Sequence, residues 1–293
     1  MKKYNILIGC ILFRELTGSE MYVYELAKGL LNNNFDVSIV SPNIGGFLTQ
    51  KAINEGINVY DFNTLPKNKK FDLIHCQHTP ITNELIRLFP LTKKICTIHS
   101  EVNSLENPVQ HTSILKYIAI RPQIKEHIIN NFKIKSDMIE VIYNPINEKK
   151  FNQNNINDNN YVLFVGTIDY LRKEAIFDLV NYAKEIGKEL WIVGRNTSNY
   201  LPYLLQNNHV KHFDSTYDIE NFVKNCSETG GILLGRTTIE GWMCGKPGWI
   251  YDVNSNGNLI SKKLHPIPND IEKFYSTNVI EQIKNEYEKI ITA

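Results

Sequence analysis

The sequence has few cysteines and no long apolar run, and both absences restrict the class of protein. No two of its five cysteines are closely spaced, as they are in zinc sites and redox-active pairs, so we expect reduced thiols in a cytoplasmic protein. No stretch approaches the roughly 20 apolar residues of a membrane-spanning helix, which predicts a soluble chain but leaves contact with a membrane surface open. The cysteines are Cys10, Cys76, Cys96, Cys226 and Cys244.

An excess of charge of one sign is also missing. The 32 basic and 31 acidic side chains give a formal net charge of +1, whereas a strongly electrostatic nucleic-acid binder normally has a basic excess. The bulk charge therefore gives that role no support. Hydrophobic residues make up 42% and charged residues 22%, which is typical of globular proteins, and 293 residues suffice for two domains of ordinary size.

Short apolar runs alternate with amphipathic segments along the chain, which predicts an α/β protein with parallel sheets covered by helices. The pattern is interrupted at residues 148–160, EKKFNQNNINDNN, which contain six asparagines and almost no apolar side chain. We interpret this segment as an interdomain linker. The sequence thus predicts one domain over residues 1–150, a second over 160–268, and a helical segment over 269–293.

The stretch GILLGRTTIEGWMCGKPGWIYDV in the second half is typical of an anion site. Its apolar run breaks at Gly235 into a polar turn, and we expect a helix from near Glu240. Backbone N–H groups and the helix dipole gather a diphosphate at such a junction. Arg236 can neutralise phosphate, while Thr237 and Thr238 can bond its oxygens or cap the helix. Glu240 can accept hydrogen bonds from a ribose diol, or merely complement the dipole.

Six segments, in order along the chain, resemble motifs of the family 4 glycosyltransferases. The resemblance implies a GT-B fold, in which two Rossmann-like doubly wound domains face a central cleft. It also implies metal-independent transfer of a sugar, with retention at the anomeric carbon, from a nucleoside diphosphate sugar to a hydroxyl, with no further cofactor. The segments are Thr17–Glu20 with Tyr24–Leu30, Phe71–His75, Cys96–His99, Val141–Asn147, Leu163–Thr167 with Arg172–Lys173, and Ile239–Pro247.

The resemblance also implies roles for single residues. His99 resembles the active-site histidine of the family, although a histidine of the core is the alternative. Arg172 and Lys173 follow the first strand of the second domain, where a cation contacts the donor phosphates, and the sequence does not choose between them. Catalytic roles are therefore predicted for His99, Arg172 and Lys173. Donor-binding roles are predicted for Gly18, Gly166, Thr167, Gly235, Arg236, Thr237, Thr238 and Glu240.

Three further expectations complete this prediction. No metal site is expected, because His75 and His78 have ligand spacing but no obvious carboxylate or thiolate partner. Thr167 stands where the family has an arginine. The resemblance implies that residues 269–293 cross back to the first domain, whereas an ordinary last helix of the second domain is the alternative.

One departure from the family pattern concerns the donor sugar. The family carries two glutamates eight residues apart, and eight positions before Glu240 stands Ile232. Either Arg236 or a first-domain residue contacts the sugar, or catalysis is impaired, or the donor is unusual. The alternatives are a nucleotide-sugar epimerase of similar fold and a nucleotide-sugar-binding protein without turnover. The sequence leaves the base, the sugar and the oligomeric state open, as well as the acceptor, which may be a glycan, lipid-linked glycan, protein, small molecule or modified nucleic acid.

Overall fold

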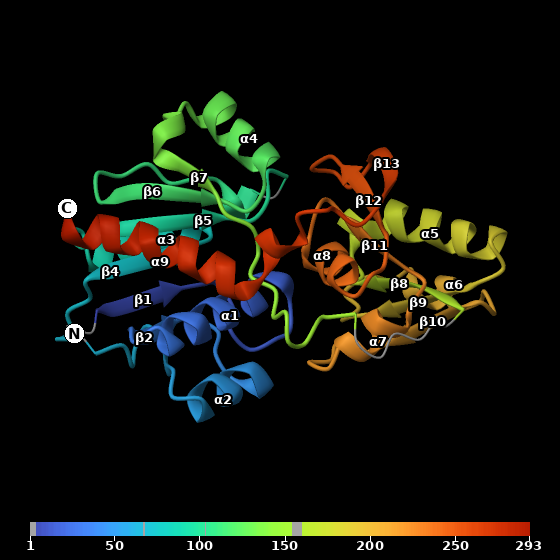
Figure 1. Cartoon of the computed structure of the whole chain (residues 1–293), viewed down its shortest axis with the longest axis horizontal. Coiled ribbons are helices and arrows are strands. Elements are labelled where there is room, and N and C mark those ends of the chain that lie inside the picture. The colour runs from blue at the N-terminus through green and yellow to red at the C-terminus, as the bar shows by residue number, and fades with distance from the viewer. Residues whose placement is uncertain (1–3, 67, 103, 154–159) are drawn as a thin grey trace. The chain divides into compact units, whose positions relative to one another are not determined.

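The computed structural model describes residues 4–66, 68–102, 104–153 and 160–293, which form two compact units (Figure 1). Unit 1 comprises Met1–Glu15, Ser19–Pro145 and Ser276–Ala293, and unit 2 comprises Leu16–Gly18 and Ile146–Tyr275. The chain thus passes from unit 1 to unit 2 after Pro145. Of the predicted linker, residues 154–159 lie outside the described residues.

Unit 1 is built on a seven-stranded parallel sheet with the strand order β3-β2-β1-β4-β5-β6-β7. Its central strands β4 and β5 are completely buried and mostly apolar, with His75, Gln77, Lys94 and Thr97 as their polar residues. The strands are β1 (Asn5–Gly9), β2 (Asp36–Val40), β3 (Asn58–Tyr60), β4 (Leu73–Gln77), β5 (Lys94–Ile98), β6 (Ile114–Ala119) and β7 (Ile139–Val141). The helices before Pro145 are α1 (Gly18–Asn32), α2 (Gly46–Asn54), α3 (Thr79–Leu88), α4 (Pro122–Phe132), η1 (Ser104–Glu106) and η2 (Ser136–Met138).

The last helix, α9 (Ser276–Thr292), belongs to unit 1, although it follows unit 2 in the sequence (Figure 1). Gly29 of α1 makes room for it, since a Cβ there would lie 2.6 Å from a side-chain carbon of Ile280. The Tyr287 hydroxyl and Nδ1 of His75 form a hydrogen bond inside the core, and Nε2 of His75 is 2.6 Å from Oγ1 of Thr97. These contacts join α9 to strands β4 and β5.

Replacing Tyr287 with phenylalanine is expected to destabilise unit 1 by about 1 to 3 kcal/mol, because Nδ1 of His75 would lose its partner inside the fully buried core. Thermal unfolding of the variant measures this loss. Tyr170→Phe is the matched control. The Tyr170 hydroxyl donates a hydrogen bond to Asn199, but the residue is 58% exposed, so water can replace the lost bond. Equal melting temperatures of the two variants would contradict a structural role of the buried bond.

Unit 2 is built on a six-stranded sheet with the order β10-β9-β8-β11-β12-β13, in which the last strand is antiparallel to its neighbour. The strands are β8 (Tyr161–Val165), β9 (Glu189–Val193), β10 (Val210–Phe213), β11 (Glu228–Ile232), β12 (Gly248–Val253) and β13 (Leu259–His265). The helices are α5 (Lys173–Glu185), α6 (Leu201–Leu204), α7 (Glu220–Asn225), α8 (Arg236–Met243), η3 (Tyr170–Arg172) and η4 (Ile271–Phe274). Leu179 of α5 and Leu204 of α6 are among its fully buried core residues.

Two details of unit 2 differ from the sequence prediction. The helix expected from near Glu240 begins four residues earlier, at Arg236, so the polar residues after Gly235 form its first turn. The residues Arg236, Thr237 and Thr238 are polar and show no apolar periodicity, which is why the sequence predicted a turn at these positions. Strand β13 was not predicted, because most of its residues are exposed and it lacks an apolar run.

Candidate functional site

The order of the strands in unit 2 reverses at the carboxyl ends of β8 and β11. From β8 the chain continues to β9 on one side of the sheet, and β11 later pairs with β8 on the other side. Ligands of open α/β sheets bind where the strand order reverses in this way. Gly166 follows β8, and Gly235 precedes the helix that follows β11. We call this region the β8/β11 site.

The backbone is unusually close-packed at this edge of the sheet. Gly166 and Gly194 both have positive φ, at 158° and 155°. A Cβ on Gly194 would lie only 2.0 Å from the carbonyl oxygen of Gly166. The Gly166 N–H donates to the Val193 carbonyl at 3.0 Å, which fixes the loop after β8 against the end of β9. Gly166, a predicted donor-binding residue, thus lies in backbone contact with Gly194, a residue that the motifs did not indicate.

Helix α8 begins at the same edge with Gly235 as its N-cap, and no side chain of the described residues caps it. The N–H groups of a helix's first turn have no partner within the helix, and the dipole is positive there. Leu233, which lies between β11 and α8, has a left-handed backbone conformation with a φ of 55°. Its N–H donates to the Tyr251 carbonyl at 2.8 Å. The Thr237 hydroxyl donates to the Val165 carbonyl at 3.3 Å, which joins α8 to the end of β8. This turn has the geometry that suits an anion.

Arg236 and Glu240 bond one another one turn apart on α8. Nε and Nη2 of Arg236 donate to Oε1 of Glu240 at 3.2 and 3.0 Å. Their side chains are 10% and 6% exposed. A carboxylate offers about four acceptor positions, so a ribose hydroxyl can bond Glu240 beside or in place of Arg236. The structure thus brings these two predicted residues together as a pair.

Thr238 lies apart from the other predicted residues. It is 1% exposed, and its Cγ2 would be 2.7 Å from a Cβ on Gly248 of strand β12. Since neighbouring positions on a helix face different directions, Thr238 turns toward the sheet while Arg236 and Glu240 share another face. Its side chain is therefore packed in the interior of unit 2.

Arg172 and Lys173 point in different directions, although they are adjacent in the sequence. Nη1 of Arg172 forms an ion pair with Asp169, and its Nε lies 3.5 Å from the position of a Cβ on Gly166. Nζ of Lys173 lies 5.9 Å from the centre of the Phe177 ring, further along α5. Of these two cations, Arg172 is therefore the one that lies beside Gly166 at the β8/β11 site. Thr167, which follows Gly166, is partly buried.

His99 lies in unit 1, immediately after strand β5. Its Nε2 is 2.9 Å from Oε1 of Gln77, and its ring meets the Tyr22 ring edge to face at 4.8 Å between centroids. Burial, with smaller contributions from His78 and His75, lowers its pKa well below the usual value, so the imidazole is neutral at pH 7. Gly18, the remaining predicted residue, is exposed at the start of α1.

Glu106 and Gln77 are two polar residues near His99 that the motifs did not indicate. The His99 backbone N–H donates to Oε2 of Glu106 at 3.1 Å, and Gln77 ends the neighbouring strand β4. Both are almost completely buried. Glu106 stands in a loop segment without a recognisable pattern, so only the folded chain reveals that it contacts His99.

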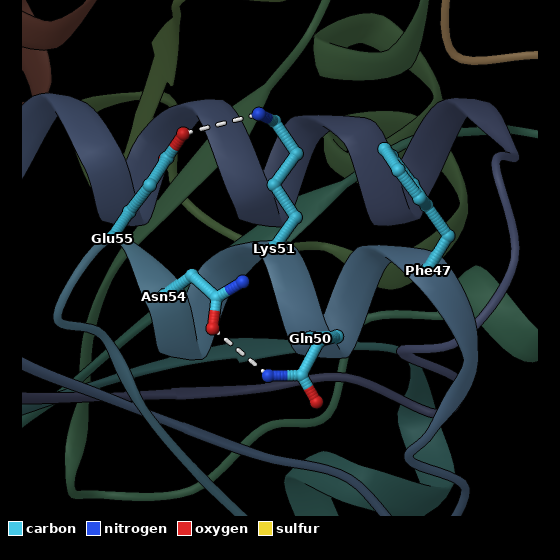
Figure 2. A pocket seen from close by; sticks show the side chains of 5 residues that line it. All are labelled: Phe47, Gln50, Lys51, Asn54 and Glu55. Atoms are coloured by element: carbon cyan, nitrogen blue, oxygen red, sulfur yellow. Dashed lines mark hydrogen bonds and ion pairs between the residues drawn. The ribbon is translucent and has the colours of Figure 1, made fainter.

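A hollow in unit 1 lies beside α2 and is lined by Phe47, Gln50, Lys51, Asn54 and Glu55 (Figure 2). The carboxylate of Glu55 accepts hydrogen bonds from the Tyr24 hydroxyl and from Lys28, both on α1, and forms an ion pair with Lys51. The polar groups in this hollow therefore fasten α2 to α1.

The described residues contain neither a cluster of metal ligands nor a helix suited to span a membrane. Within residues 4–66, 68–102, 104–153 and 160–293, no group of three or more His, Cys, Asp and Glu side chains is placed to hold a metal ion. None of the helices in this part of the chain has the length and apolar character needed to cross a bilayer.

The comparisons with known proteins agree with the resemblance predicted from the motifs. Residues 16–150 match the model of Glycosyltransferase Family 4, which confirms that resemblance. No curated protein matches the chain.

Several solved glycosyltransferases share the whole architecture. One from Rickettsia africae ESF-5 has a TM-score of 0.68 at 16% identity, and the match covers 99% of both chains. Anabaena Alr3699/HepE, in complex with UDP-glucose, has a TM-score of 0.65 at 15% identity, with 98% and 92% covered. An alpha-glucosyltransferase bound to UDP and a 13-mer DNA with an HMU base has a TM-score of 0.59 at 13% identity, with 99% and 95% covered. These likenesses confirm the predicted fold, which is that of GT-B glycosyltransferases.

Proposed function

We propose, with the family 4 match of residues 16–150 as the premise, that this protein is a glycosyltransferase which takes its sugar from a uridine diphosphate sugar and transfers it to a hydroxyl acceptor. The observation that supports this most is the β8/β11 site, where the first turn of α8, the Gly166 backbone and the Arg172 guanidinium meet at the switch point of the sheet. Uridine is the proposed base because solved proteins of this fold hold UDP or UDP-glucose.

The chemistry of the site suits a departing diphosphate. In glycosyl transfer, negative charge grows on the leaving group as its bond to the anomeric carbon breaks. The N–H groups at the start of α8 and the Arg172 guanidinium are prearranged donors for that charge. Glu240 is proposed to bond the ribose hydroxyls. Arg236, released in part from Glu240, would bond a phosphate oxygen.

The finer features of the reaction belong to the same proposal. Metal-independent transfer with retention at the anomeric carbon is supported by the resemblance to family 4. A cytoplasmic location is supported by five cysteines that are all free and buried. The proposal names no acceptor, since the solved proteins of this fold include one bound to DNA and another described as involved in Avilamycin A biosynthesis.

Arg172 is expected to matter far more for donor binding than its neighbour Lys173. Arg172→Ala should raise the dissociation constant of UDP on the order of 10- to 100-fold, since a hydrogen bond to a charged group contributes about 1.5 to 3 kcal/mol. Lys173→Ala is the matched control and should change the constant less than about threefold, because its ammonium group lies over Phe177. Isothermal titration calorimetry measures both. A reversed order would contradict the assignment of Arg172.

Product analysis decides between the transferase and its alternatives. The protein is first screened by thermal shift with nucleoside diphosphate sugars, and the best ligand is then incubated with candidate acceptors and without any. Release of UDP together with a glycosylated acceptor supports the proposal. An epimerised sugar nucleotide formed without acceptor would identify an epimerase, and tight binding with neither transfer nor hydrolysis would identify a binding protein. Absence of any binding would overturn the proposed function.

A further inference from the structure

Two strand ends of unit 1 converge on one buried carboxylate, that of Glu106. Oε2 of Glu106 accepts the backbone N–H of His99, which follows β5, at 3.1 Å. Oε1 lies 3.3 Å from Nε2 of His78, which follows β4. Glu106 itself is 5% exposed at the end of η1. A single side chain thus bridges the ends of two adjacent strands and the loop after them.

His78 has a backbone conformation that side chains seldom adopt. Its φ is 63° and its ψ is 133°, between the end of β4 and the start of α3. Such a conformation costs about 1 to 3 kcal/mol and persists where surrounding contacts enforce it. The contacts here are Glu106 and the His99 ring, which stacks on the His78 ring at 6.2 Å and 25°. Glu106 therefore holds His78 in the place from which it supports His99.

The polar atoms around His99 are only partly used by the protein. Nε2 of His99 bonds Oε1 of Gln77, whereas Nε2 of Gln77 and Nδ1 of His78 are buried and have no hydrogen-bond partner among the described residues. Buried polar atoms without partners are rare, and each calls for a structural reason. These two atoms mark the surroundings of His99 as shaped for an interaction rather than for stability alone.

The protonation states fit a neutral pair. Burial lowers the pKa of His78 to about 4 and raises that of Glu106 to about 7. Near pH 7 His78 is therefore neutral, and Glu106 carries a proton for a substantial part of the time. A glutamine in place of Glu106 has an oxygen to accept the His99 N–H and an amide to donate to Nε2 of His78.

We propose that Glu106 is a positioning residue, which sets the direction of the His99 imidazole in sugar transfer by holding the His99 backbone and the His78 ring together. This inference depends on the proposed function, and nothing in the family motifs assigns Glu106 a role. Glu106 contacts no reacting atom in this scheme. It acts through the ends of β4 and β5.

The test compares three variants by two measurements. Glu106→Ala should lower kcat on the order of 100-fold, since small displacements of a reacting group have effects of that size, while KM for the donor changes less than about threefold. Glu106→Gln should restore kcat to within about threefold of the parent protein. Thr79→Val is the matched control for simple loosening of the loop, because its hydroxyl donates to the carbonyls of Leu105 and Asn107 at 3.0 and 2.6 Å.

The second measurement needs no turnover and separates this inference from the proposed function. NMR of histidine labelled at the ring should show the His99 signals displaced in Glu106→Ala and near their original positions in Glu106→Gln and Thr79→Val. If the parent protein transfers no sugar, the proposed function fails while the spectra still test the positioning of His99.

The inference is overturned if Glu106→Ala leaves the His99 signals in place. It is equally overturned if Glu106→Gln displaces them as much as alanine does. Should alanine prevent folding, Glu106→Leu replaces it in both measurements, because leucine fills the space but can bond neither the His99 N–H nor His78.

Discussion

Replacing Glu240 with alanine is expected to weaken the binding of UDP on the order of 100-fold, which corresponds to about 2.7 kcal/mol. Two effects contribute to this loss. The ribose would lose a charged acceptor, and the Arg236 guanidinium, only 10% exposed, would lose the carboxylate that holds it. Calorimetry with UDP measures the change in affinity, and thermal unfolding measures the change in stability.

The two contributions can be separated with a second substitution. Because removal of one partner of a buried ion pair costs about 3 to 5 kcal/mol, the Glu240→Ala variant should also unfold at a lower temperature. The double variant Arg236→Ala with Glu240→Ala removes the charge that has lost Glu240 and should recover part of the stability. Its affinity for UDP should be lower than that of Arg236→Ala alone if Glu240 bonds the ribose, because both variants lack the proposed contact of Arg236 with a phosphate. Equal affinities of these two variants would contradict that role and leave Glu240 with a structural one.

Replacing Gly194 with alanine is expected to destabilise unit 2 by about 3 kcal/mol or more, and to lower its melting temperature by roughly 6 to 12 °C. The added methyl group would lie 2.0 Å from the Gly166 carbonyl oxygen, in a backbone with a φ of 155°. The position of a Cβ is fixed by its own backbone and the clashing oxygen is a backbone atom, so no rotamer change relieves the clash. The loop after β8 would have to move, and UDP affinity should fall together with stability.

Gly187→Ala is the matched control for this substitution. Gly187 has a φ of 68°, but a Cβ there would have nothing within 4 Å. Its replacement therefore carries only the left-handed backbone cost of about 1 to 2 kcal/mol, with no clash and no effect on UDP binding. Differential scanning calorimetry compares the two variants. A Gly194→Ala protein as stable as Gly187→Ala would show that the loops after β8 and β9 separate easily, contrary to the close packing seen here.

The sequence indicated the architecture well because parallel sheets leave a strong local signal. Strand β8, YVLFV, is almost completely buried and is a continuous run of apolar and aromatic residues. Strand β13 leaves no such signal, since it is an edge strand with exposed side chains. The motifs likewise indicated the start of α8 and the loop after β8, because these features lie within a few adjacent residues.

Motifs are less informative about where a side chain points. They did not distinguish Arg172 from Lys173 as the donor-binding cation. In the structure Arg172 lies beside Gly166, whereas Lys173 lies over the Phe177 ring. They grouped Thr238 with the donor-binding residues, whereas its place on α8 turns it toward β12. In each case the direction depends on how a helix packs on its sheet.

The sequence by itself determined the alternation of strands and helices, the resemblance to family 4 and the segments from which the candidate site is drawn. These properties are local, since they depend on residues a few positions apart. Only the tertiary structure decided that Gly194 lies against Gly166, that Glu106 joins His78 to His99, and that Tyr287 bonds His75. Tyr287 and His75 are 212 positions apart, and such partners are chosen by the packing of whole elements, which no short segment records.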